Sequence, residues 1–245
     1  MPRIQFSIRV LLFMIGCAAI CCVIYSRFSF PEVAGKPAMA DLFNTGNTAK
    51  EIRAFLMEST HPVDRVILNG NLVNDDSIKG FGDYRHVKNI SVTFFRSWCG
   101  TGLPPTTHLK CALTDRAVER LVRLQALEEL HLPQTEITDD GISQLAQLPN
   151  LRKLSVAGND ITATGFAPFP ANCKLEELDI SRTLVSDSDL ANIGHLGNLR
   201  ILRCNKTQVT ADGLSHLLAL KNLEEIHVPT DGLSFRAVYR FFQAL

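Results

Sequence analysis

The feature that most constrains this chain is a repeat with a constant period of 24 residues. The pattern L-x-x-L-x-L occurs five times in one register, starting at Leu127, Leu151, Leu175, Leu199 and Leu223. The last four residues of each copy alternate apolar and polar side chains, as a strand with one buried face does. Each copy is therefore predicted to be a short strand.

The second half of each repeat has a helical period. From Ile137 to Leu148 the apolar residues lie three and five positions apart, which is typical of an apolar stripe along a helix. A hydroxyl residue precedes each stripe, where it can accept a hydrogen bond from a helix amide, at Thr138, Thr162, Ser186, Thr210 and Ser234. A strand and a short helix cannot bury their apolar sides alone, so the repeats must stack into an α/β solenoid.

The same register continues towards the N-terminus. Val63–Leu68 and Val87–Val92 are two more predicted strands, which gives about seven repeats over residues 63–245. Residues 49–62 have the spacing of an amphipathic helix that caps the first strand. The distance from Val87 to Leu127 is 40 residues, which is 16 more than one period, and this predicts an insertion at 93–112.

These repeats resemble the leucine-rich repeats, whose pattern L-x-x-L-x-L-x-x-N/C-x-L is met by Leu151, Leu154, Val156, Asn159 and Ile161. Because the asparagine position elsewhere holds Thr135, Thr183, Thr207 and Asp231, we expect a weaker ladder of turn hydrogen bonds than in the family. The motif that runs from Thr135 to Ile142 is similar to bacterial members and to the repeats of F-box proteins. The resemblance implies a horseshoe with a concave parallel sheet, convex helices and a protein-binding concave face.

The N-terminal segment, residues 1–30, contains an uninterrupted apolar run from Val10 to Tyr25. Three interpretations remain open: an uncleaved signal anchor that forms one transmembrane helix, a cleaved secretory signal, and a lipoprotein signal with Cys17 as the lipidated residue. The anchor is favoured. Because Arg3 and Arg9 precede the run, the N-terminus is expected in the cytoplasm and the repeats outside it. Residues 31–48 are predicted to be a linker.

The insertion carries aromatic residues and two cysteines. Phe94, Phe95 and Trp98 either anchor a partner or pack back onto the edge of the solenoid. A disulfide between Cys99 and Cys111 would stabilise the loop by about 3 kcal/mol in the chain-entropy model. The alternative, a nucleophile or metal site made of these cysteines and His108, lacks a third orienting group.

The concave face is the other candidate binding surface, because its outward side chains form columns across the stacked strands. The candidates are Glu129, His131, Lys153, Ser155, Glu177, Asp179, Arg203, Asn205, Glu225 and His227. Charges of opposite sign alternate along these columns, so the pairs either neutralise one another or contact a partner. His131 and His227 are four strands apart, about 19 Å by the strand spacing, and cannot share a metal.

Composition argues against other functions. The 25 basic and 25 acidic residues balance, so charge gives no attraction to nucleic acid. No catalytic carboxylate pair, phosphate loop or nucleophile motif is present, and no cofactor, metal or small-molecule substrate is expected. The prediction is a membrane-anchored, non-catalytic protein interaction scaffold or receptor-like module. The alternative is a structural envelope protein that binds glycan or stabilises a complex.

Overall fold

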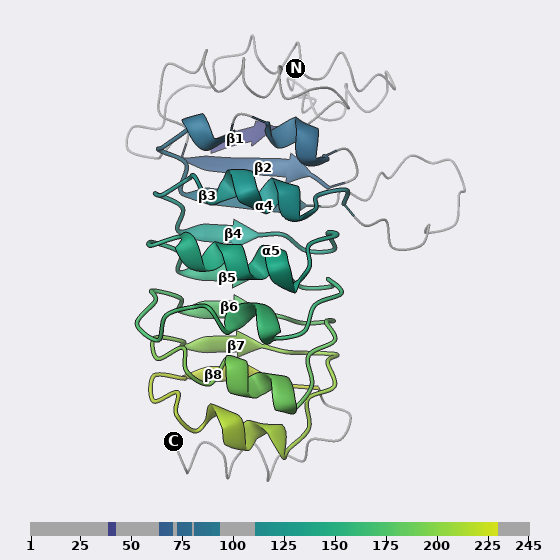
Figure 1. Cartoon of the computed structure of the whole chain (residues 1–245), viewed down its shortest axis with the longest axis vertical. Coiled ribbons are helices and arrows are strands. Elements are labelled where there is room, and N and C mark those ends of the chain that lie inside the picture. The colour runs from purple at the N-terminus through teal and green to yellow at the C-terminus, as the bar shows by residue number, and fades with distance from the viewer. Residues whose placement is uncertain (1–38, 43–63, 71–72, 80, 94–110, 230–245) are drawn as a thin grey trace, which may run out of the picture. The chain divides into compact units, whose positions relative to one another are not determined.

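The computed structural model describes residues 39–42, 64–70, 73–79, 81–93 and 111–229. One parallel sheet of eight strands runs through them in chain order, with every strand beside the next one in sequence (Figure 1). The strands are β1 (Met39–Leu42), β2 (Arg65–Asn69), β3 (Asn89–Thr93), β4 (Glu129–His131), β5 (Lys153–Ser155), β6 (Glu177–Asp179), β7 (Ile201–Arg203) and β8 (Glu225–His227). The predicted solenoid is confirmed.

The strand register aligns equivalent residues of successive repeats. Glu129 of β4 lies opposite Lys153 of β5, which lies opposite Glu177 of β6. Between these outward side chains, the middle residues of β4 to β7 point inward and are buried: Leu130, Leu154, Leu178 and Leu202. The alternation that predicted the strands therefore separates an apolar core from a polar face.

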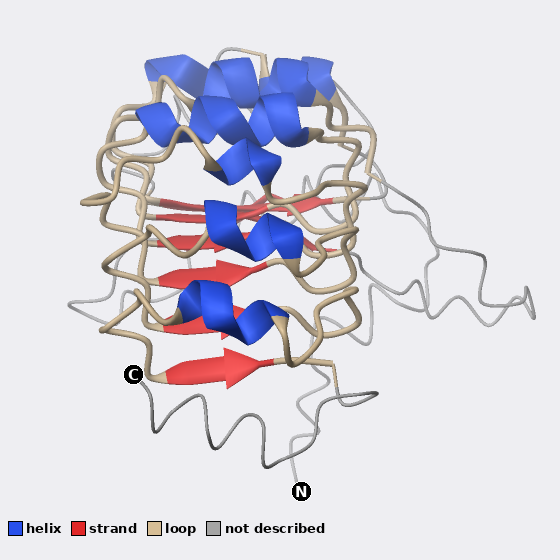
Figure 2. Ribbon diagram, turned by 60° about the horizontal axis from the view of Figure 1, so that its bottom comes forward, coloured by secondary structure: helices blue, strands red, loops and turns tan. Residues whose placement is uncertain are grey.

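Short helices cover the other side of the sheet (Figure 2). Two described helices are α-helical, α4 (Asp115–Leu121) and α5 (Asp139–Gln144). The others are 3-10 helices: η1 (Asp75–Ile78), η2 (Phe81–Asp83), η3 (Leu145–Gln147), η4 (Thr164–Phe166), η5 (Ser188–Asn192) and η6 (Gly213–Leu217). Each helical half is only one or two turns long, a length at which the tighter 3-10 form is common.

The predicted helix caps are present in three repeats. Thr138, Thr162 and Thr210 each accept a hydrogen bond from the amide two residues later, at 3.3 Å. Ser186 does not: its amide and its hydroxyl both bond the Asp189 carboxylate, at 2.8 and 2.5 Å. Ser234 lies outside the described residues.

An aspartate of the preceding repeat holds most of these threonines, a contact that the sequence analysis missed. Asp115 accepts hydrogen bonds from the amide and hydroxyl of Thr138, at 2.9 and 2.6 Å. We call this contact the Asp–Thr clamp, and it recurs in the pairs Asp75–Thr114, Asp139–Thr162 and Asp187–Thr210. The clamp is absent between the repeats of β5 and β6. Ala163 stands there at the aspartate position, and Ser186, at the threonine position, bonds Asp189 of its own repeat.

The turn after each strand carries the expected ladder in its weaker form. Asn159 accepts from the Thr135 amide at 2.5 Å and donates to the carbonyls of Leu132 and Val156, both at 2.9 Å, so it joins two repeats. Thr183 and Thr207 only donate to the carbonyl three residues earlier in their own repeat. Threonine therefore closes the turn without linking it to the neighbouring one.

One prediction for the N-terminal part of the chain needs correction, and another is not tested. Residues 31–48 are not wholly a linker, because Met39–Leu42 form β1, which pairs in parallel with β2. Backbone pairing at the sheet edge needs no apolar alternation in the sequence, so the pattern did not reveal this strand. The predicted capping helix at 49–62 lies outside the described residues.

The predicted Cys99–Cys111 disulfide is not formed. Cys111 is a free cysteine with no exposed surface, and its thiol donates to the Val73 carbonyl at 3.6 Å. Cys111 lies 24 residues before Thr135 and forms a parallel β-bridge with it. Cys111 therefore occupies the asparagine position of its own repeat. The insertion thus ends before Cys111, and Cys99, Phe94, Phe95 and Trp98 lie outside the described residues.

Thiol labelling distinguishes the described cysteines. Burial raises the pKa of Cys111 to about 11 and that of Cys204 to about 12, so about one thiol in a thousand or fewer is ionised at pH 8. N-ethylmaleimide at pH 8, followed by peptide mass mapping, is expected to modify the half-exposed Cys173 well before either of them. In urea all three should react at similar rates. Rapid modification of Cys111 in the folded protein would contradict its place in the core.

Residues 1–38, which include the predicted membrane anchor, lie outside the described residues. In the part of the chain that the structure describes, no helix is long and apolar enough to cross a bilayer.

Candidate functional site

The concave face brings the predicted candidate residues together in two columns. The first column runs through Arg65, Asn89, Glu129, Lys153, Glu177, Ile201 and Glu225, and the second through Ile67, Ser91, His131, Ser155, Asp179, Arg203 and His227. Nine of the ten predicted candidates lie in these columns, and Asn205 does not. The strands fix the order of the side chains, because each outward position faces its equivalent in the next repeat.

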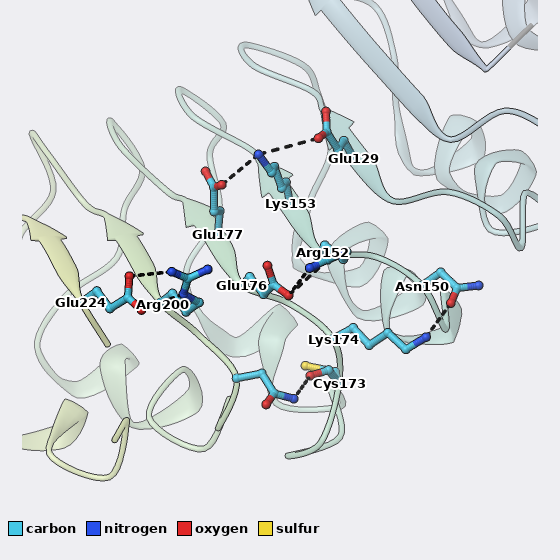
Figure 3. Close-up of polar contacts among 11 residues, drawn as sticks. Glu129, Asn150, Arg152, Lys153, Cys173, Lys174, Glu176, Glu177, Arg200 and Glu224 are labelled. Carbon is cyan, nitrogen blue, oxygen red and sulfur yellow. Dashed lines mark hydrogen bonds and ion pairs between the residues drawn. The ribbon is translucent and has the colours of Figure 1, made fainter. Parts of the chain in front are cut away.

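Ion pairs cross-link the first column (Figure 3). Lys153 Nζ lies 2.9 Å from Glu177 Oε1 and 3.7 Å from Glu129 Oε1, and Asn89 donates to Glu129. Hydrogen bonding to Glu177 raises the pKa of Lys153. Desolvation raises the pKa of Glu177, but the bond and charge of Lys153 outweigh it, so that this pKa is lowered. The middle of the column is thus braced by ion pairs in which one lysine contacts two glutamates.

Among the described residues, no ion pair joins two members of the second column. Asp179 accepts from the Ser155 hydroxyl at 3.4 Å and from the Ser181 amide at 3.0 Å. Arg203 lies 3.6 Å from Glu177 rather than pairing with Asp179, its neighbour in the column. Burial lowers the pKa of His131, which favours the neutral imidazole.

The C-terminal end of the face holds the remaining candidates. Glu225 and His227 lie on β8 and are hydrogen-bonded to each other. Asn205 follows β7, and its carbonyl accepts from the Arg182 amide at 2.8 Å. His131 and His227 are on β4 and β8, four strands apart, as expected.

A polar groove beside the concave face was not foreseen. It has a volume of about 770 Å³ and lies where the chain enters the strands. Two columns with the 24-residue period make most of its lining: Glu128, Arg152, Glu176, Arg200 and Glu224, and Asn150, Lys174, Asn198 and Asn222. We call it the rim groove. The alternation of acid and arginine in the first of these columns was visible in the sequence, but only the positions inside the strands had been read as columns.

Ion pairs also connect the repeats along the rim groove (Figure 3). Arg152 contacts the Glu176 carboxylate through Nη2 at 2.6 Å and Nε at 3.1 Å. Arg200 binds both oxygens of Glu224, at 2.9 and 2.7 Å, which lowers the pKa of Glu224 and raises that of Arg200. Lys88 pairs with Glu128 at 2.8 Å, and the bond raises the lysine pKa. Each acid of this column therefore has a basic partner in the preceding repeat.

The described residues of both surfaces form hydrogen bonds and ion pairs. Within the described ranges, no cluster of three or more histidine, cysteine or acidic side chains is placed to hold a metal ion. What the face offers is a fixed array of hydrogen-bond donors, acceptors and charges.

Comparisons with known proteins agree with this geometry. A family model described as Leucine Rich repeat matches residues 147–168, and no curated protein matches the sequence. Among solved structures, internalin C2 of Listeria monocytogenes is 23% identical with a TM-score of 0.56, over 83% of this chain and 76% of that one. This likeness shows a shared fold.

Two further structures match less fully. Internalin F of the same bacterium is 17% identical, with a TM-score of 0.47 over 73% of this chain and 52% of its own. The Arabidopsis receptor kinase HAESA, in complex with a peptide hormone and a co-receptor, is 18% identical, with a TM-score of 0.47 over 72% of this chain and 27% of its own. These matches give no support to the narrower resemblance to F-box proteins.

Proposed function

We propose, from the premise that this chain is a leucine-rich-repeat protein, that it is a non-catalytic module that binds a protein partner through its concave face. The observation that carries the proposal is the register of the strands, which holds two columns of polar side chains in fixed order. A surface that is rigid before binding loses little conformational entropy when a partner docks.

The second column supplies the specificity in this proposal. His131, Ser155 and Asp179 are half-buried and project from adjacent strands, and their described contacts leave hydrogen-bonding capacity for a partner. In the first column, by contrast, Lys153 and its two glutamates pair with one another, and the three residues keep one net negative charge. This column braces the face.

The location of the module is part of the same proposal. The apolar run from Val10 to Tyr25 anchors the chain in a membrane, with the N-terminus in the cytoplasm and the repeats on the other side. Protease added to intact cells is expected to remove the repeats and to spare the N-terminal segment. Repeats that are cleaved only after lysis would contradict this orientation.

Site-specific crosslinking tests the concave face. We expect full-length protein with benzoylphenylalanine in place of Ser155 to give one discrete polypeptide adduct in its own membrane on irradiation. Substituting Asp179→Asn together with Arg203→Gln should reduce that adduct at least fivefold, because it removes two charged contacts at once. Unchanged far-UV circular dichroism would show that the fold survives, since exposed pairs contribute only about 0 to 1 kcal/mol.

A matched control on the convex side makes the result interpretable. Arg116 and Asp140 are exposed residues on α4 and α5, and Arg116→Gln with Asp140→Asn removes the same two charges. This variant should leave the adduct intact. Equal loss in both variants, or equal crosslinking from a probe at Arg116, would overturn the assignment of the concave face.

A further inference from the structure

One column of the rim groove contains a residue that does not act as its equivalents do. Asn150, Asn198 and Asn222 each donate through Nδ2 to a carbonyl of the preceding repeat, at 2.9, 2.7 and 2.7 Å. The equivalent residue in the remaining repeat is Lys174. Its Nζ bonds Asn150 Oδ1 at 2.7 Å, and not the carbonyl of Pro149 that an asparagine would reach. Lys174 therefore does not form the side-chain hydrogen bond to a carbonyl of the preceding repeat that the three asparagines form.

Lys174 is also distinct in its electrostatic partners. The acids that line the groove are each bound by another basic residue: Glu128 by Lys88, Glu176 by Arg152 and Glu224 by Arg200. The hydrogen bond of Lys174 is to a neutral amide oxygen, and among the described residues it forms no ion pair. The groove thus holds a fixed, exposed ammonium whose charge no acid neutralises.

Two guanidinium groups line the same groove in neighbouring repeats. Arg152 and Arg200 are in the repeats before and after Glu176, and each binds its glutamate through Nε and Nη2. Nη1 of each has no partner in the described part of the chain, and both side chains are about half exposed. An acidic segment that lies along the groove can therefore place one carboxylate at Lys174 and another at a free Nη1 without breaking an existing pair, and such charge-assisted bonds are among the stronger ones.

We propose that the rim groove binds side-chain carboxylates of an acidic protein segment, with Lys174 as the principal contact and Arg152 and Arg200 as further donors. This inference rests on the proposed function in that the ligand belongs to a protein. A neutral sugar chain suits the groove less well, because its lining includes no aromatic ring on which a sugar could stack. The groove adjoins the concave face, so one partner can contact both.

Fluorescence anisotropy with a labelled octaglutamate peptide tests the inference on the full-length chain in detergent micelles. We expect saturable binding at low ionic strength that weakens with added salt, since exposed charges are screened over a Debye length of about 10 Å at 0.1 M. Octaglutamine should not bind. Lys174→Asn, which restores the residue of the other repeats and should fold normally, is expected to weaken binding at least tenfold. The control Arg116→Gln, which removes a positive charge from the convex side, should change it less than twofold.

Other outcomes are equally informative. Octaglutamate binding that Lys174→Asn leaves unchanged would overturn the proposal, and so would the absence of binding. Dextran sulfate that binds in a Lys174-dependent way, when octaglutamate does not, would replace the acidic protein segment with an acidic glycan. Because this assay does not involve Asp179 or Arg203, its failure leaves the crosslinking test of the concave face intact, and the reverse also holds.

Discussion

Replacing Phe166 by alanine is expected to lower the free energy of unfolding by about 3–5 kcal/mol, the range for deleting a buried aromatic side chain. Phe166 is fully buried at the end of η4, and its ring packs against Phe169 with 5.6 Å between the centroids. Equivalent positions of neighbouring repeats hold Ile142, Leu190 and Leu214. Urea denaturation followed by far-UV circular dichroism measures the loss.

Phe166→Leu is the matched control for this variant, because it installs the side chain that two other repeats use. The cost should be smaller, at about 1–2 kcal/mol. It should not vanish, because Asn172 is exposed where other repeats bury Leu148, Leu196 and Leu220, and the two phenylalanines fill that space. If Phe166→Ala costs no more than Phe166→Leu, the ring is not the packing element that its burial indicates.

The second large effect is expected at Asn159. Asn159→Leu should lower the free energy of unfolding by about 3 kcal/mol or more, because a buried amide and two carbonyls lose their partner, and each such group costs about 1–3 kcal/mol. The groups are the Thr135 amide and the carbonyls of Leu132 and Val156. The measurement is the same urea titration.

Thr183→Val provides the comparison at the equivalent turn. Thr183 is buried too, but its hydroxyl bonds only the Ile180 carbonyl, at 2.6 Å. The expected cost is about 1 kcal/mol. Equal costs for the two substitutions would mean that linking two turns adds nothing to closing one.

The repeat made most of this architecture predictable. Since one register of 24 residues runs from Leu127 to Leu223, assigning one strand assigned the others, and the columns of the concave face followed without any knowledge of tertiary contacts. The partners within those columns did not follow. Arg203 lies 3.6 Å from Glu177 although Asp179 is directly opposite it in the strand register, and Ser155 and Ser181 bond the Asp179 carboxylate.

The sequence predictions were wrong where the insertion interrupts the 24-residue period. Cys111, at its end, could be either a disulfide partner or a buried core residue. Cys111 was assigned to the insertion with Cys99, since two cysteines that bracket a loop favour a disulfide. Counting back 24 residues from Thr135 would have placed Cys111 in the core instead. The rim groove was overlooked because its residues precede the strands, where alternation gives no signal.

The missing Asp–Thr clamp at Ala163 has a consequence for how the molecule unfolds. In a linear array each unit contacts only its neighbours, so the stability is a sum of unit and interface terms. At the junction between β5 and β6 the clamp is absent and no asparagine joins the turns after the strands, whereas the junction between β4 and β5 has both contacts. We therefore expect neighbouring repeats to be coupled less strongly there than between β4 and β5, and unfolding to separate the array at this point first.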